Sequence, residues 1–520
     1  MTGAHGGAPV GGADVVVVGA GGSGAALAAR LSEDPDRQVV LVEAGPAPVD
    51  RSGFPPPLLD GGRVVGADPD DPLNWRFPAE LTPGRPWVVT RGRVLGGSTA
   101  TNGGYFVRPR PEDLDRWSAA GGPTWSWDAV QPLLRGLETD LDLGGTPGHG
   151  STGPVPVRRA PLGSPAAAAF VAAAVEAGHA LEPDKNAPGT GGIGAVPTTV
   201  VDGIQVNTGS AYVLPALSRP NLTVLGGTRV RRVVVERGVA TGCEIERGGR
   251  VGVLPAGEVV LAAGAIGSAH LLVLSGIGPR DVLTRLGLPV LRDAPVGRFG
   301  DHPQVVLEWQ PRPGLPAPPP GTWLAGALNT SVGEGPRSGD LEVLQSLVPM
   351  AALAGGPRAD PGAPLPLLVS VQTPVRSGRL EVTSADPGTP PRLHSGYLST
   401  GADRRRVRQA VRTALDVATT RSFREVSAGV VGLAAATAAD DDALDGWIAG
   451  HLGTSFHTCG TAPIGGPDDP DAVVAPDGRV HGIRGLRVAD TSILPTAPLR
   501  GPALSAVLVG ELIADRMRQG

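Results

Sequence analysis

Runs of apolar residues divide the first fifty positions of this chain into a strand, a helix and a second strand. Residues 15–18 are four consecutive valines, and residues 39–42 are again wholly aliphatic. Short unbroken runs of this kind are typical of strands buried on both faces of a parallel sheet. Between them, residues 25–31 are rich in alanine and leucine, which favour a helix. The pattern predicts a βαβ unit.

Similar patterns continue to the end of the chain. Residues 221–225 and 230–235 read as adjacent strands, and residues 258–262 form an apolar run that leads into a helix at 269–275. By the same criteria, helices are predicted at 127–137, 165–177, 403–419, 441–452 and 503–517, and strands at 341–347 and 367–372. Stretches rich in proline and glycine separate these elements, which indicates loops.

The order of the elements predicts a mixed α/β (α+β) fold with two domains. Residues 1–160, 205–305 and 450–520 are assigned to a discontinuous Rossmann-like domain with a parallel sheet, because a later strand–helix unit returns the chain to the first domain. Residues 161–204 and 306–449 are assigned to a second domain, with an antiparallel sheet flanked by helices.

The turn after the first strand carries the spacing of a dinucleotide-binding loop. Gly19, Gly21 and Gly24 give the pattern G-x-G-x-x-G between the strand and the helix, and Glu43 ends the second strand. These glycines serve a tight turn, close approach to a pyrophosphate and helix–strand packing, and the acid accepts hydrogen bonds from a ribose. The acid favours FAD or NAD over NADP. The alternative is an ordinary βαβ unit with a chance glycine turn, in a chain of 78 glycines.

Composition excludes several classes of protein. Apolar residues make up 41% of the chain, which excludes wholesale disorder, and a net charge of −5 gives no indication of a nucleic-acid partner. Two cysteines indicate neither a disulfide framework nor a metal site, as in a reducing cytosol. No apolar run approaches the ~20 residues that span a bilayer. We expect a soluble cytoplasmic protein without a transmembrane segment; peripheral attachment at the inner membrane face is the alternative.

Four ordered sequence blocks resemble the glucose–methanol–choline (GMC) oxidoreductases. They are the first glycine loop, residues 93–98 with Asn102, residues 262–279, and a carboxy-terminal block from His457 to Thr496. The resemblance covers most of the chain. It implies FAD bound by the discontinuous domain, substrate bound by the second domain, and oxidation of an alcohol by hydride transfer to flavin N5.

The resemblance also assigns residues to the cofactor. It places the ADP half at Gly19, Gly21, Gly24 and Glu43, the pyrophosphate or ribityl chain at Gly97 and Ser98, the isoalloxazine near Asn102, the adenine at the main chain of Val230, and the flavin side at Asp490; Arg93, Gly103 and Ala263 belong to the same expected site. Some relatives tether the flavin through a histidine just before this asparagine. Thr101 stands there in this chain, so we expect dissociable FAD.

His457 is the expected catalytic base, because it opens an H-x-x-G-T segment as the family's histidine does. An imidazole takes and returns a proton near neutrality; the alternative is a structural histidine. His302 lies in a Gly-Asp-His-Pro turn and is expected to be structural.

Where most relatives carry a second His or Asn, this chain has Gly501. Arg500 is a candidate to fill the gap beside the flavin, and a solvent-facing loop residue is the alternative. Asn102 completes the expected catalytic set.

Two short segments set this chain apart within the family. The Asn-Gly-Gly-Tyr-Phe segment at 102–106 and the Arg-Gly-Pro segment at 500–502 resemble an actinobacterial subgroup associated with the redox peptide mycofactocin. That resemblance implies a dehydrogenase that oxidises reduced mycofactocin and passes electrons to a quinone-linked or dye-like carrier. It also suggests that the glycines at 103, 104 and 501 widen the opening above the flavin. The alternatives are a small-molecule alcohol oxidase or dehydrogenase, a non-redox lyase of the same fold, and a binding protein.

Overall fold

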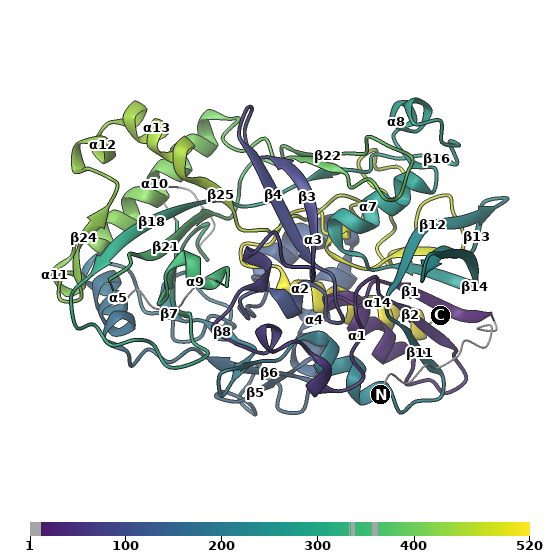
Figure 1. Cartoon of the computed structure of the whole chain (residues 1–520), viewed down its shortest axis with the longest axis horizontal. Coiled ribbons are helices and arrows are strands. Elements are labelled where there is room, and N and C mark those ends of the chain that lie inside the picture. The colour runs from purple at the N-terminus through teal and green to yellow at the C-terminus, as the bar shows by residue number, and fades with distance from the viewer. Residues whose placement is uncertain (1–11, 332, 334–337, 356–361, 520) are drawn as a thin grey trace.

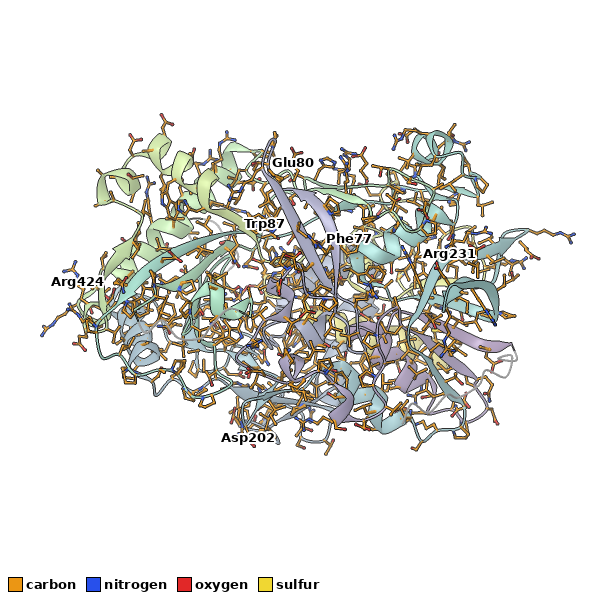
Figure 2. The ribbon with its side chains drawn as sticks, viewed as in Figure 1. Phe77, Glu80, Trp87, Asp202, Arg231 and Arg424 are labelled. Carbon is orange, nitrogen blue, oxygen red and sulfur yellow. The ribbon has the colours of Figure 1, made fainter. Side chains whose placement is uncertain are left out.

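A computed structural model describes residues 12–331, 333, 338–355 and 362–519. The described residues form two main layers (Figure 1). They contain two large apolar cores and a smaller third one around Trp323. Arg231 and Arg424 mark opposite sides of the molecule, one in each layer (Figure 2). Among the described residues, every helix is too short or too polar to cross a bilayer. The residues before position 12 lie outside the described range.

The first layer is a parallel sheet made from distant parts of the chain. Its strands run in the order β11-β2-β1-β14, and β26 pairs with the other edge of β14. The valines of β1 are almost fully buried in the first core, and α1 packs against β1 and β2. Bounds are β1 Ala13–Val18, β2 Val39–Val42, β11 Leu222–Leu225, β14 Arg250–Leu261 and β26 Leu486–Val488. The predicted parallel sheet of a discontinuous domain is therefore confirmed.

One predicted strand pairing is wrong. β11 pairs with β2, whereas β12 (Thr228–Glu236) pairs antiparallel with β13 (Val239–Arg247), which in turn pairs with the first half of β14. The chain thus crosses from one edge of the sheet to a three-stranded antiparallel extension (Figure 1). Strand propensity gave both segments correctly, but pairing partners depend on where the chain turns.

Helices from both ends of the chain pack together on the parallel sheet. α1 (Gly22–Leu31) contacts the last helix, α14 (Ala503–Gln519), along its length. A Cβ at Gly510 would lie 2.3 Å from the carbonyl oxygen of Ser23, so the two backbones touch. Arg30 Nε and Glu511 Oε2 add an ion pair at 2.8 Å. α7 (Gly264–Leu274) follows β14 directly.

The second layer is an antiparallel sheet with helices on it, as predicted. Its strands run β24-β18-β21-β20-β19-β7, and β25 also pairs with β18. β18 buries alternate side chains, and its Trp309 packs edge-on against Phe423 at 4.9 Å between ring centroids. Bounds are β7 Ile193–Ala195, β18 Pro303–Pro311, β19 Leu324–Thr330, β20 Leu341–Ser346, β21 Leu365–Val371, β24 Ser427–Val431, β25 Leu452–Thr454, α5 Pro165–Glu176, α10 Gly401–Ala418 and α13 Asp441–His451.

A third sheet connects the two layers. The hairpin of β3 (Asn74–Glu80) and β4 (Pro86–Gly92) pairs with β23 (Arg392–His394), which pairs with β22 (Gly378–Glu381) and through it with β17 (Arg298–Phe299). Apolar side chains of β22 and β23 belong to the core of the first layer. The division of the chain at 306–449 remains a prediction, and these strands favour moving residues 378–394 to the first domain.

We predict that Gly24→Ala destabilises the protein and weakens its cofactor binding. A Cβ there would lie 1.9 Å from the carbonyl oxygen of Gly19, so α1 would have to move away from β1. Overpacking of this kind costs about 1–3 kcal/mol. Urea denaturation of cofactor-free protein measures the loss. Gly450→Ala is the control, because that exposed position in α13 has open space around it; equal stability of Gly24→Ala and wild type would contradict the prediction.

Candidate active site

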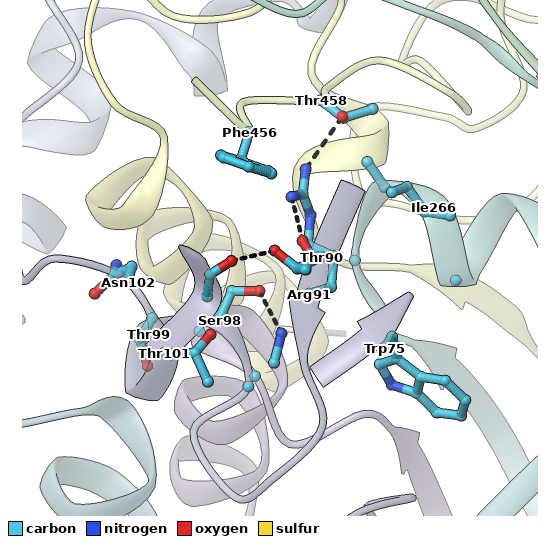
Figure 3. Close-up of a pocket in the computed structure, with 18 of the residues that line it drawn as sticks. Trp75, Thr90, Arg91, Ser98, Thr99, Thr101, Asn102, Ile266, Phe456 and Thr458 are labelled. Atoms are coloured by element: carbon cyan, nitrogen blue, oxygen red, sulfur yellow. Dashed lines mark hydrogen bonds between the residues drawn. The ribbon is translucent and has the colours of Figure 1, made fainter. Parts of the chain in front are cut away.

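A cavity of about 550 Å³ extends from the carboxyl ends of β1 and β2 to the sheet of the second layer. Figure 3 shows some of the residues that line it. The structure brings most of the residues predicted from sequence to its walls. Those lining it are Gly19, Gly21, Glu43, Gly97, Ser98, Asn102, Gly103, Val230, Ala263, His457 and Asp490. Gly24, Arg93 and Arg500 do not line it.

Two glycine loops form the narrow part of the cavity. Gly19 has a φ of 100° and Gly97 a φ of 52°, which glycine tolerates best. A Cβ at Gly97 would lie 2.6 Å from the Cα of Gly21, so the loops meet backbone to backbone. Their surfaces can therefore approach a pyrophosphate closely at the start of α1, where free N–H groups favour negative charge. The residues present fit a dinucleotide.

Glu43 supports the first loop from within. One oxygen of its carboxylate accepts the N–H of Ala20 at 3.0 Å, and the other accepts the N–H of Gly45 at 2.8 Å. Burial raises the pKa of Glu43 to about 7, against the effect of these bonds. The carboxylate thus holds the turns after β1 and β2 together, and Glu43 itself lines the cavity.

Arg93 lies behind the cavity wall and does not itself line the cavity. Its guanidinium carbon lies 5.3 Å from the ring centroid of Trp75, and that of Arg229 lies 5.6 Å from the same ring. Trp75 and Arg229 both line the cavity here, and Figure 3 shows the indole of Trp75. Two cations over one indole hold the ring in place. The sequence prediction named Arg93 and missed the aromatic residue that it supports.

Asp490 organises the start of α7. Its Oδ2 accepts the N–H of Gly264 at 2.9 Å and the hydroxyl of Ser268 at 2.5 Å. Its Oδ1 accepts the N–H of Ser492 at 2.8 Å. Burial raises the pKa of this carboxyl, and the hydrogen bonds oppose the rise. Asp490 therefore fixes the backbone of residues 263–264, which lines the cavity.

Strand pairing assembles the other end of the cavity. Pro303 at the start of β18 lies opposite Thr454 at the end of β25, so the segments just outside the two strands lie side by side. Asp301 Oδ1 accepts the N–H groups of His302 and His457 at 2.8 and 2.7 Å. Its Oδ2 accepts the hydroxyl of Thr458 at 3.0 Å. A single buried carboxylate thus positions both histidine segments.

His457 lies at this end with its imidazole toward the cavity. The residue before it, Phe456, has a φ of 61°, which is unusual for an aromatic residue and is typical of functional sites. Burial lowers the pKa of His457 well below 6.5, and His302 and the cation of Arg91 lower it further. Arg91 Nη2 donates to Thr458 Oγ1 at 3.1 Å (Figure 3). The imidazole is therefore neutral at neutral pH, as a base requires.

His302 is the direct partner of His457, which the sequence prediction did not foresee. The two Nδ1 atoms lie 2.8 Å apart, so one ring must donate to the other. The His302 ring also faces the carbonyl groups of Gln372 and Pro498, although its Nε2 makes no hydrogen bond of normal geometry. Those carbonyls favour a proton on Nε2 of His302. Nδ1 of His302 then accepts from Nδ1–H of His457, which leaves Nε2 of His457 as a free base.

Gly501 leaves a space directly beside this base. A Cβ there would lie 3.5 Å from Nε2 of His457 and 3.6 Å from Cδ1 of Tyr105. Arg500 does not fill the space. Its fully buried guanidinium donates instead to the carbonyl oxygens of Ser338, Gly339 and Leu499, behind the wall. The structure therefore does not support Arg500 as a group facing a flavin, and it is not a solvent-facing residue either.

Three glycines were expected to widen the site, but packing and backbone conformation explain two of them. A Cβ at Gly103 would lie 2.2 Å from Cζ2 of Trp323, whose Nε1 donates to the Gly103 carbonyl at 2.9 Å. Gly104 has a φ of 73°, which a turn with glycine adopts easily. Asn102 lines the cavity, and its Oδ1 accepts the N–H of Gly104 at 3.0 Å and Nε2 of Gln205 at 2.9 Å. Only Gly501 opens the cavity as expected.

A cluster of side chains of the kinds that bind metal ions lies outside this cavity. Glu138, Asp140 and His149 offer atoms within 4.8 Å of one another. Their carboxylates raise the pKa of His149 to about 10, so the ring is a cation that bridges the acids. Arg108 and Arg159 pair with the same carboxylates at 2.6 Å each. The cluster is an ion-pair network, in which Oε2 of Glu138 is the oxygen without a hydrogen-bond partner among the described residues.

The geometry defines a dinucleotide-dependent oxidoreductase with a neutral imidazole at the far end of its cofactor channel. The GMC oxidoreductase family models match residues 13–304 and 374–510. The chain belongs to this family of FAD-dependent oxidoreductases that act on alcohol-type substrates. It is 37% identical over 508 residues to an uncharacterized GMC-type oxidoreductase of Rhodococcus erythropolis, covering 96% of this chain and 97% of that protein.

Further relatives have named activities. An oxygen-dependent choline dehydrogenase of Rhizobium meliloti is 32% identical over 538 residues, covering 97% of this chain and 95% of the relative. The crystal structure of pyridoxine 4-oxidase from Mesorbium loti matches with a TM-score of 0.88 at 29% identity over 98% of this chain and 99% of the other. A variant of Aspergillus oryzae RIB40 formate oxidase shares the fold, with a TM-score of 0.89 at 23% identity over 99% of both chains.

We predict that His302→Ala slows flavin reduction by at least about 10-fold, because His457 loses the acceptor that fixes its tautomer. His302 also lowers the pKa of His457, so its removal moves the acidic limb of the pH profile upward. Stopped-flow flavin reduction from pH 5 to 9 measures both effects. His302→Asn restores an acceptor and recovers part of the rate. An unshifted profile in His302→Ala would assign the residue a purely structural role.

Proposed function

We propose that this protein oxidises a small alcohol, with His457 Nε2 receiving the proton of the substrate hydroxyl. The observation that carries the proposal is the neutral, buried imidazole, which faces open space at Gly501 in the same cavity as the dinucleotide loops. Bound FAD supplies the acceptor for the hydride that leaves the substrate carbon. The glycine loops hold its pyrophosphate, and the walls around His457 exclude water and orient the hydroxyl.

The substrate we favour is small. Trp323 occupies the space beside Gly103, and Met350 and Leu353 add apolar side chains to the same wall. These apolar side chains narrow the wall at this end, which favours the small-alcohol alternative over a redox peptide such as mycofactocin. The choline dehydrogenase and pyridoxine 4-oxidase relatives are also named for small substrates. The mycofactocin assignment and electron transfer to a quinone-linked or dye-like carrier stay predictions from the sequence.

We expect His457→Ala to slow flavin reduction by an alcohol on the order of 10²–10⁴-fold, the usual effect of removing a positioned acid–base group. Bound FAD and thermal stability should change little, because the imidazole lies at the far end of the cavity. Anaerobic bleaching of the flavin against a panel of alcohols measures the rate. His451→Ala, at an exposed position, is the matched control. Equal rates in wild type and His457→Ala would refute the role, and a flavin that no alcohol reduces would favour a non-redox lyase.

We predict that the FAD is bound non-covalently, so that denaturation of the protein releases it. Thr101 precedes Asn102 and lines the cavity, and its hydroxyl cannot form the tether that a histidine forms in some relatives. Acid precipitation of the yellow protein should leave all flavin absorbance in the supernatant. Yellow colour in the washed pellet would show a covalent bond made through another residue.

A further inference from the structure

A second polar group lies near the space at Gly501. A Cβ at Gly501 would lie 3.6 Å from Cδ1 of Tyr105, as well as 3.5 Å from Nε2 of His457. The hydroxyl of Tyr105 donates to Oε2 of Glu342 at 3.2 Å. Tyr105 and Glu342 both line the cavity. The carboxylate therefore stands about one tyrosine side chain away from the space beside the base.

Glu342 has capacity for a further hydrogen bond. Besides Tyr105, Oε2 accepts Nδ2 of Asn329 at 3.0 Å. Oε1 accepts only a long bond of 3.4 Å from Nε2 of Gln372, which also donates to Ser370 at 2.6 Å. A carboxylate offers about four acceptor positions. The oxygen with the weaker partner can thus accept a donor from the cavity.

No ion pair among the described residues neutralises Glu342, which is only 1% exposed. Lys185 is the single lysine of the sequence, and its Nζ pairs with Oε2 of Glu182 at 2.6 Å. Arg500 and Lys185 favour the charged form of Glu342 through space. Neither donates a hydrogen bond to Glu342, since the guanidinium of Arg500 donates to backbone carbonyl groups. Burial raises the pKa of Glu342. A buried acid with incomplete bonding is costly, and a donor on a ligand would offset that cost.

Most of the other side chains that line this end are apolar. They are Trp323, Leu324, Leu344, Met350, Leu353 and Leu368. Gln304 is a polar exception, and its Oε1 accepts the hydroxyl of Ser455 at 3.2 Å. A few directed polar groups in a mainly apolar pocket are typical of sites that select a ligand by the position of its polar atoms. Here His457 and the pair of Glu342 with Tyr105 are such groups.

We propose that Glu342, held by Tyr105, forms a subsite that binds a hydrogen-bond donor on the substrate, a second hydroxyl or a protonated amine separated by an apolar segment from the alcohol that is oxidised. The proposal rests on the proposed alcohol oxidation at His457 and names its substrate class. No covalent step takes place at Glu342. Its carboxylate orients the substrate so that the reacting hydroxyl reaches Nε2 of His457.

A site built to accept such a donor discriminates against an analogue that lacks it, because the buried carboxylate then remains underbonded. Hydrogen bonds to charged groups correspond to a preference on the order of 10- to 100-fold. Three alcohols of equal length test this preference: pentan-1-ol, pentane-1,5-diol and 5-aminopentan-1-ol. We expect kcat/KM of the FAD-loaded enzyme to favour the diol or the amino alcohol over pentan-1-ol by that factor.

Variants separate recognition from structure. Glu342→Leu should abolish the preference, so that the kcat/KM ratio between the diol or the amino alcohol and pentan-1-ol falls to about one. Glu342→Gln should keep a preference for the diol and lose one for the ammonium group, which identifies the donor. Asp340→Asn is the matched control, because that buried acid precedes the same strand but does not line the cavity. FAD content and thermal midpoint show whether each variant folds.

A binding measurement keeps the proposal testable if alcohol oxidation fails. Isothermal titration calorimetry with pentylamine and pentane-1,5-diol on the FAD-loaded protein detects the subsite without turnover. Binding of either ligand to wild type that Glu342→Leu weakens at least about 10-fold supports the subsite, even if no alcohol bleaches the flavin. Two results would overturn it: neither ligand binds wild type, or the ratio of kcat/KM values is the same in wild type and Glu342→Leu.

Discussion

The close contact of backbones at the carboxyl end of the parallel sheet is the constraint on which this structure depends. Gly19, Gly21, Gly24 and Gly97 allow the start of α1, the end of β1 and a second loop to approach without Cβ atoms between them. This contact creates a cradle for a pyrophosphate at the start of a helix. It also fixes the position of α1, on which α14 packs. The segment just before α14 contains Gly501, so the same contact places one side of the catalytic end.

Buried carboxylates do most of the positioning in the cavity. Glu43 holds the first loop, Asp490 the start of α7, and Asp301 the two histidine segments. Each accepts two or more backbone or hydroxyl donors, which compensates for burial. The role of these three carboxylates is to hold backbone segments in place; they do not react with the substrate. Their loss would release backbone segments, whereas loss of His457 would remove only a reacting group.

The contacts of the two histidines determine their charge and which ring nitrogen can accept a proton. His302 and His457 share one hydrogen bond, with Arg91 close to the pair. Two buried rings beside a fixed cation remain neutral, because a second positive charge would be poorly solvated there. The neutral state makes Nε2 of His457 an acceptor. Glu342 lines the same cavity and is an acceptor too, so the proposed subsite and the base would hold two different donors of one substrate.

The sequence alone predicted the features that depend on local pattern. Runs of valine, the glycine spacing and helical periodicity indicated the parallel sheet, the dinucleotide loops and the helices at both ends of the chain, and eleven of the expected site residues do line the cavity. The block that contains His457 indicated the family's histidine. These signals work because strand burial, tight turns and helix packing each require particular residues close together in sequence.

Only the tertiary structure decided which residues meet across the cavity. The pairing of β18 with β25 brings His302 to His457, although 155 residues separate them. The packing of Trp323 explains Gly103, and backbone carbonyls beyond the wall hold Arg500 away from the cavity. Glu342 reaches the same cavity from a strand in the other layer. Such contacts depend on strand register and layer packing, which residue types within one segment do not encode.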